Sequence, residues 1–191
     1  MKISGGKFRG RRLSEPRDNR VRPTSDKVRQ AIFNILAHND FGTGFLFEGA
    51  KVIDIFAGTG ALGIEALSRG ASFCLFVEDN AESRALIRTN IEALNLTGAT
   101  KVWRRDGTEL GPLTAGAGGP FDLAFLDAPY RRGLTQRALD GLVQGGWLTK
   151  NALVVAETAA DESLSTLDPF QLLDHRSYGE TSVHTFGISP T

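Results

Sequence analysis

The chain has 191 residues, of which 41% are hydrophobic and 23% are charged, and its formal net charge is zero. This length is sufficient for one domain with a sizeable core, and the apolar content is that of a globular protein. A single cysteine excludes an internal disulfide framework, and no apolar run approaches the length of a membrane span. Residues 1–6 lack the apolar core of a secretory signal, so we expect a cytoplasmic protein.

Positive charge is concentrated at the N-terminus. Residues 1–30 hold ten Lys or Arg and three Asp or Glu, a net charge of +7, and the remainder carries −7. A basic arm on an acidic body favours an anionic polymer as partner, although a solvated tail has the same composition. Residues 2–13 alternate in polarity and carry Gly5-Gly6 at a turn position, so we expect a short β-hairpin there.

A helix is expected to follow this arm. Pro23-Thr24-Ser25 precedes apolar residues that recur at helical spacing from Val28 to Leu36. Thr24 or Ser25 can cap the free N–H groups of the first turn, and Asn39 and Gly42 mark the end.

From Lys51 onward the pattern alternates between strands and helices. We expect strands at 52–56, 73–77, 101–104, 121–126, 152–156, 172–178 and 183–188, with the last two as an antiparallel pair. Helices are expected from the glycine turn to about residue 68, at 81–94 and at 134–143. Such alternation predicts an α/β fold with a mostly parallel sheet that helices cover on both faces.

The first of these strands leads into a glycine-rich turn. Residues 58–63 read Gly-Thr-Gly-Ala-Leu-Gly, and Glu78 ends the next strand 20 residues after Gly58. On spacing alone this pattern fits a dinucleotide or S-adenosylmethionine equally well. Asp54 favours S-adenosylmethionine, because an anionic pyrophosphate would be repelled by a carboxylate that a methionine ammonium would attract. The alternative role for Asp54 is a structural hydrogen bond to the N–H groups of the loop.

A second acid follows the third strand. Asp106 can accept a hydrogen bond from the adenine amino group, with Gly107 easing the turn, or it is a solvated loop residue. We therefore predict a cofactor site formed by Asp54, Phe56, Ala57, Gly58, Gly60, Glu78, Asp106 and Gly107.

Asp127-Ala128-Pro129-Tyr130 directly follows the apolar run 121–126. The carboxyl ends of strands in open α/β sheets are where ligands bind. An exocyclic amine on a base is a poor nucleophile, and a site activates it by accepting both of its hydrogens. Asp127 and the Ala128 carbonyl offer these acceptors, Pro129 stiffens the segment, and Tyr130 can stack on the base. An ordinary strand-ending turn is the alternative interpretation.

The choice of Asp bears on the identity of the base. The pairing edge of guanine presents two adjacent donors, N1–H and the N2 amine, which match an acceptor-only carboxylate. Adenine presents a donor beside an acceptor, which suits Asn better, so Asp127 modestly favours guanine. No metal is needed for catalysis by positioning and fixed dipoles, and we expect none.

Over nearly its whole length the chain resembles the RsmD-type methyltransferases, which modify guanine N2 in small-subunit (16S) ribosomal RNA. The matching segments are residues 5–11, 22–29, 34–36, 54–63, 65–71 and 178–181. The resemblance implies a Rossmann-like seven-stranded sheet and S-adenosylmethionine as cofactor. It also implies cofactor contacts at Asp54, Gly58, Gly60, Glu78 and Asp106, catalysis at Asp127, Ala128, Pro129 and Tyr130, and a role near the target base for Arg22, Pro23, Thr24 and Ser25.

We accordingly expect residues 1–40 to form an RNA-contacting extension and residues 41–191 to form the methyltransferase domain of a monomer. Its partner would be small-subunit RNA within the assembling or assembled 30S particle. We expect phosphate contacts from Arg9, Arg11, Arg12, Arg131 and Arg132. Glu157 ends the fifth strand and is either close to the site or a surface acid, and we favour the surface acid.

One residue departs from the family pattern. Ala128 stands where the family usually has a first proline, which removes rigidity but keeps the backbone carbonyl, so we expect activity to be retained. Three alternatives stay open: a non-catalytic RNA-binding assembly factor, a DNA adenine-N6 methyltransferase and, more remotely, a dehydrogenase.

Overall fold

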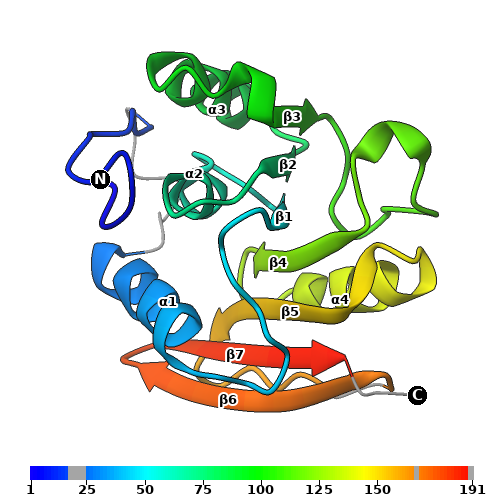
Figure 1. Cartoon of the computed structure of the whole chain (residues 1–191). Coiled ribbons are helices and arrows are strands. Elements are labelled where there is room, and N and C mark those ends of the chain that lie inside the picture. The colour runs from blue at the N-terminus through cyan, green and yellow to red at the C-terminus, as the bar shows by residue number, and fades with distance from the viewer. Residues whose placement is uncertain (17–24, 166–167, 189–191) are drawn as a thin grey trace.

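A single seven-stranded sheet forms the centre of the molecule (Figure 1). The computed structural model describes residues 1–16, 25–165 and 168–188. Its strands are β1 (Lys51–Ile55), β2 (Phe73–Val77), β3 (Thr100–Trp103), β4 (Phe121–Asp127), β5 (Leu148–Ala159), β6 (Phe170–Tyr178) and β7 (Thr181–Ile188). They lie in the order β3-β2-β1-β4-β5-β7-β6. The predicted α/β class and mostly parallel sheet are confirmed.

The strand order reverses after β3: β2 and β3 lie on one side of β1, and β4 and the later strands lie on the other. Strand β1 pairs in parallel with β2 on one side and with β4 on the other, and β2–β3 and β4–β5 are also parallel. Strand β7 runs antiparallel to both β5 and β6, as expected for the closing pair. The loops that follow β1 and β4 therefore leave the same edge of the sheet in opposite directions, and open α/β sheets bind ligands in the crevice at such a point.

Four α-helices cover the two faces of the sheet in the described parts of the chain (Figure 1). They are α1 (Asp26–His38), α2 (Ala61–Ser68), α3 (Ala81–Ala93) and α4 (Leu134–Gln144), with short 3-10 turns at Thr97–Ala99 and Ala115–Ala117. One core cluster joins α1, α2 and α3 to Val52 and Leu123, and a second joins α4 to Ile53 and Ala124. Neighbouring residues of a strand thus enter opposite cores, which explains why these strands read as continuous apolar runs.

Several elements extend beyond their expected bounds. Strand β5 begins at Leu148 and ends at Ala159, whereas the apolar pattern marked only residues 152–156. Strand β7 includes the polar pair Thr181-Ser182, both buried, because its backbone continues to pair with β5 there. The hydrophobic pattern marks only the buried centre of a strand, whereas backbone hydrogen bonds to the neighbouring strand continue beyond the apolar residues.

Helix α1 begins at Asp26. Ser25 is the N-cap, and its hydroxyl accepts a hydrogen bond from the Val28 N–H at 3.2 Å. Asn39 is the C-cap, as the sequence indicated. Thr24, the alternative cap, lies outside the described residues.

The β-hairpin expected over residues 2–13 is wrong. A single antiparallel bridge, Lys2 with Arg12, closes this segment into a loop. Gly5-Gly6 is not its turn but its contact with α2: a Cβ at Gly6 would lie 1.8 Å from the Ser68 carbonyl oxygen. The cross-segment backbone bonds are few, and the middle of the segment bonds to α2: Lys7 N–H donates to that carbonyl at 2.7 Å and Phe8 N–H to the Ser68 hydroxyl at 2.9 Å.

A buried carboxylate joins the N-terminal segment to two helices. Glu65 of α2 is fully buried and accepts hydrogen bonds from Ser4 N–H at 2.9 Å and Gly5 N–H at 2.8 Å. Arg69 lies 3.1 Å from the same carboxylate, and Arg29 of α1 lies 3.7 Å from it. Arg29 is itself 1% exposed, and it also donates to the Lys2 carbonyl. A buried charge is tolerated only when it is paired and hydrogen-bonded, as Glu65 is here.

No helix in the described ranges is long and apolar enough to cross a membrane.

Glu65→Ala should lower the free energy of unfolding by about 3 kcal/mol, because it leaves Arg29 buried without one of its two carboxylates. Urea unfolding measures this loss, and proteolysis should detect release of residues 1–16. Glu92→Ala, which removes an exposed carboxylate from α3, is the control and should change stability by less than about 0.5 kcal/mol. A loss for Glu65→Ala as small as that of the control would contradict the role of this ion pair.

Candidate functional site

The turn between β1 and α2 has a left-handed backbone at three positions. Gly58 and Gly60 have φ values of 56° and 78°, and Phe56, which is not a glycine, has a φ of 61°. The Phe56 and Ala57 N–H groups both donate to the Val77 carbonyl at the end of β2, at 3.1 and 3.3 Å. A non-glycine residue in this conformation is strained and is held by its surroundings, which is common in ligand-binding loops.

Glu78 lies beside this turn, as its spacing of 20 residues indicated. One carboxylate oxygen accepts from Gly58 N–H at 2.8 Å and the other from Asn80 N–H at 2.9 Å. Burial raises the pKa of Glu78, and the two N–H bonds partly oppose that rise. The carboxylate therefore fixes the glycine turn from the end of the neighbouring strand.

Asp54 is buried within β1, with an exposed fraction of 1%. It accepts from the N–H of Gly63 at 2.9 Å, so it makes a structural bond, but the donor lies in the first turn of α2 and not in the loop as the alternative role supposed. Burial raises the pKa of Asp54 well above its usual range, and the negative charges of Asp127 and Glu78 raise it further. Asp127 and Glu78 are therefore close enough to act electrostatically on Asp54, near the carboxyl ends of β1, β2 and β4.

Gly63 permits α2 to approach the sheet closely. A Cβ at this position would lie 2.5 Å from both the Cys74 sulfur and the Phe76 ring of β2. Cys74 is fully buried in the core. The third glycine of the motif therefore serves helix–sheet packing, while the first two shape the turn.

The Asp106 carboxylate bonds within its own turn. It accepts from the N–H and the hydroxyl of Thr108, both at 2.8 Å, and these bonds lower its pKa. Gly107 lies against the turn after β1, since a Cβ there would be 2.9 Å from the Phe56 ring and 2.4 Å from Ile55. The third strand's loop and the glycine turn are thereby brought together, as the predicted cofactor site requires.

Strand β4 ends in the predicted catalytic segment. Asp127 is the last residue of the strand and is half-buried, Ala128 is 2% exposed, and Pro129 is exposed. Asp127 lies opposite Glu157 in the parallel register of β4 and β5. Glu157 was expected to be a surface acid, and that expectation is wrong, because only 5% of it is exposed.

Two residues outside the predicted catalytic segment contact it. The Tyr130 hydroxyl donates to a carboxylate oxygen of Glu157 and lies 3.0 Å from the Thr181 hydroxyl. Burial raises the pKa of Tyr130, and the bond to Glu157 raises it further. The position of Glu157 at the end of a strand beside β4 was a usable signal, whereas nothing near Thr181 in the sequence indicated this contact.

The predicted RNA-contacting residues occupy several surfaces. Arg9, Arg11, Arg12 and Arg132 are exposed, and Arg131 is paired with Asp161 at 3.0 Å. Arg22, Pro23 and Thr24 lie outside the described residues, and Ser25 is the cap of α1.

Asn90 of α3 joins the basic segment to the glycine turn. Its side-chain amide donates to the carbonyl of Thr59 at 3.0 Å and to that of Ser14 at 3.3 Å, and its oxygen accepts from Ser14 N–H at 2.7 Å. The sequence pattern contained no signal for this residue, because a buried Asn inside a helix has no characteristic spacing.

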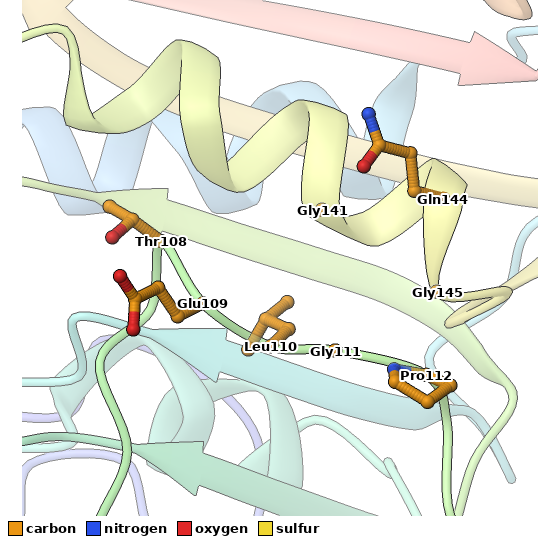
Figure 2. A pocket seen from close by; sticks show the side chains of 8 residues that line it. All are labelled: Thr108, Glu109, Leu110, Gly111, Pro112, Gly141, Gln144 and Gly145. Carbon is orange, nitrogen blue, oxygen red and sulfur yellow. The ribbon is translucent and has the colours of Figure 1, made fainter.

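A hollow of about 490 Å³ lies between residues 108–112 and the end of α4 (Figure 2). Its lining residues are Thr108, Glu109, Leu110, Gly111, Pro112, Gly141, Gln144 and Gly145. No residue of the predicted site lines this hollow.

The residues at the crevice fit S-adenosylmethionine. A Cβ at Gly58 would have nothing closer than 4.0 Å, so the backbone there faces open space that a ligand can approach. Asp54, Glu78 and Asp127 place three acidic side chains there, and acidic groups suit a sulfonium and an ammonium better than an anionic pyrophosphate. Among the described residues, no group of three or more His, Cys, Asp or Glu side chains is placed to hold a metal.

Comparison with known proteins gives consistent matches over nearly the whole chain. The family model described as Conserved hypothetical protein 95 matches residues 1–187. Ribosomal RNA small subunit methyltransferase D of Escherichia coli K12 is 37% identical over 87% of this chain and 79% of its own length. The Haemophilus influenzae protein of that name is 30% identical over 97% and 93%. The solved structure of yhhF from Escherichia coli has a TM-score of 0.83 and 28% identity, and covers 100% of this chain and 99% of that one.

Gly63→Ala should lower the free energy of unfolding by about 1–2 kcal/mol, because the new methyl group meets Cys74 and Phe76 at 2.5 Å. The matched control is Gly141→Ala in α4, where no atom lies within 4 Å of the new Cβ. That change should leave stability equal or raise it by up to about 1 kcal/mol, since Ala favours helix. Chemical denaturation compares the two, and equal effects would refute the packing role of Gly63.

Proposed function

The chain belongs to the Conserved hypothetical protein 95 family, the RsmD-type ribosomal RNA small subunit methyltransferases, and from this premise we propose its specific reaction. The enzyme transfers a methyl group from S-adenosylmethionine to the exocyclic N2 amine of a guanine in small-subunit ribosomal RNA. The observation that carries the proposal is the meeting of Asp54, Glu78 and Asp127 at one edge of the sheet.

S-adenosylmethionine supplies an electrophilic methyl group on a sulfonium. We assign its binding to Asp54, Glu78 and the turn at 56–60, with the Asp106–Gly107 turn closing the adenine end. The burial of Glu78 and its bonds to Gly58 and Asn80 hold its carboxylate in a fixed orientation before any ligand arrives. A preorganised acceptor costs less to align with ribose hydroxyls than a mobile one.

Asp127 and the Ala128 carbonyl are assigned to the amine of the base. Acceptance of both N2 hydrogens favours the pyramidal amine, whose lone pair is then directed at the methyl group. The second carboxylate oxygen of Asp127 matches guanine N1–H, which adenine lacks. Burial of Ala128 limits the motion of its peptide, which compensates for the absent proline. The Tyr130 ring is assigned to stack on the base.

Exposed arginines are assigned to the RNA backbone. Arg9, Arg11 and Arg12 lie on the N-terminal segment, and Arg131 and Arg132 follow the catalytic tyrosine. We propose that residues 1–40 form an extension that contacts RNA, and that the substrate is the folded RNA of the small-subunit particle. Arg131 would exchange its exposed partner Asp161 for a phosphate at little cost, because a surface ion pair is weak.

Asp127→Ala should lower the single-turnover rate of methyl transfer to unmethylated small subunits by at least about 100-fold, because the amine loses its principal acceptor. Labelled S-adenosylmethionine followed by nucleoside analysis should show N2-methylguanosine as the product. The matched control is Asp122→Asn, at the opposite end of β4, where the carboxylate accepts from Lys51 N–H. N6-methyladenosine as product, or full activity of Asp127→Ala, would overturn the proposal.

Replacement of Arg9, Arg11 and Arg12 by Gln should weaken RNA binding and flatten its salt dependence. Loss of three phosphate contacts should reduce the slope of log K against log salt by about 2. A charge-matched control replaces Lys101, Arg137 and Lys150, which lie outside the N-terminal segment. Equal salt slopes for the wild type and the Arg9, Arg11, Arg12 variant would refute RNA contact by this segment.

A further inference from the structure

The turn between β6 and β7 lies against the catalytic segment, although its residues are far apart from that segment in sequence. Gly179, with a φ of 64°, reverses the chain, and Thr181 then opens β7 opposite Ala159. The Glu180 carbonyl accepts from Ala160 N–H at 2.9 Å, which fixes the turn on the end of β5. The turn therefore delivers the Thr181 side chain to the edge where β4 ends.

Tyr130 makes two hydrogen bonds at this edge. Its single hydroxyl proton is donated to Glu157, so the phenolic oxygen accepts from Thr181 at 3.0 Å. Both partners are buried, with exposed fractions of 5% for Glu157 and 4% for Thr181. A buried carboxylate and a buried hydroxyl, each on a strand of the sheet, restrict the ring more firmly than solvent-exposed partners would.

The residue after the tyrosine is held at the same edge. Arg131 adopts a left-handed φ of 58°, and its N–H donates to the Glu162 carboxylate at 3.1 Å. The backbone thus turns sharply directly after Tyr130. Bonds on the hydroxyl and on the following peptide together define the orientation of the ring.

We propose that Glu157 and Thr181 are positioning residues that fix the Tyr130 ring in the orientation needed to stack on the target base. The inference rests on the proposed function and deepens it, because it assigns roles to Glu157 and to the Tyr178–Thr181 turn. Neither residue reacts with the substrate. Both act through the phenol, and their contribution lies in holding the base at the methyl donor, where small displacements cost rate.

A double-mutant cycle on Tyr130 and Glu157 tests the proposal. Tyr130→Phe keeps the ring and removes the hydroxyl, and Glu157→Gln keeps the size of the acceptor but weakens the bond. Each single variant should lower the single-turnover rate at saturating RNA by about tenfold, with the affinity for S-adenosylmethionine unchanged. The double variant should be no slower than the slower single variant, since both changes break the same contact.

Glu92→Gln, on the exposed surface of α3, is the matched carboxylate control and should keep the wild-type rate. Multiplied losses in the double variant, or single variants as fast as wild type, would overturn the proposal. A wild-type enzyme that transfers no methyl group would instead refute the proposed function.

A spectroscopic measurement distinguishes failure of the positioning proposal from failure of the proposed function, because it requires no substrate. The chain has two tyrosines, so in a Tyr178→Phe background the phenolate absorbance reports Tyr130 alone. Glu157→Gln removes a negative charge that raises the pKa of Tyr130, so the phenol should ionise at lower pH than in the parent protein. Thr181→Val removes the second bond to the phenol and should lower the single-turnover rate as the other single variants do. An unshifted ionisation in Glu157→Gln, or a wild-type rate in Thr181→Val, would show that these contacts do not hold the phenol.

Discussion

The reversal of strand order between β1 and β4 is the constraint on which the site depends. Because β1 pairs with β2 on one side and β4 on the other, the loops that follow β1 and β4 diverge from the same edge. That divergence brings the glycine turn and Asp127 to the same edge, although the two segments are far apart in the sequence. The cofactor and base-binding assignments use residues at this edge, from Glu78 after β2 to Glu157 near the end of β5.

Buried carboxylates that accept backbone N–H groups hold the surrounding segments in place. Asp54 binds the N–H of Gly63, Glu78 binds that of Gly58, and Glu65 binds those of Ser4 and Gly5. A buried carboxylate without such partners would be strongly unfavourable, so each bond also restricts the segment that provides it. The same chemistry therefore stabilises the fold, shapes the cofactor turn and joins the basic N-terminal segment to α2.

The sequence predicted the sheet and the four α-helices of the described residues, because apolar residues recur along the chain where side chains are buried. It also predicted correctly that Glu78 lies beside the glycine turn, since the carboxyl ends of parallel strands lie at one edge of the sheet. It failed at residues 2–13, where Gly5-Gly6 resembled a turn but serves close contact with α2. The contacts of Thr181 and Asn90 were not predicted, because side-chain contacts between distant strands and helices leave no periodic signal in the chain. The strand-end position of Glu157 was a signal, but the interpretation as a surface acid was favoured over it.

Hydrogen–deuterium exchange with and without S-adenosylmethionine tests most directly that the crevice between β1 and β4 is the cofactor site. Saturating cofactor should slow exchange in residues 56–60 and 78–80, because the turn and the end of β2 become covered and less mobile. The hollow beside α4 provides the internal comparison. Slowed exchange confined to residues 108–112 and 141–145, with no change at 56–60, would contradict the account.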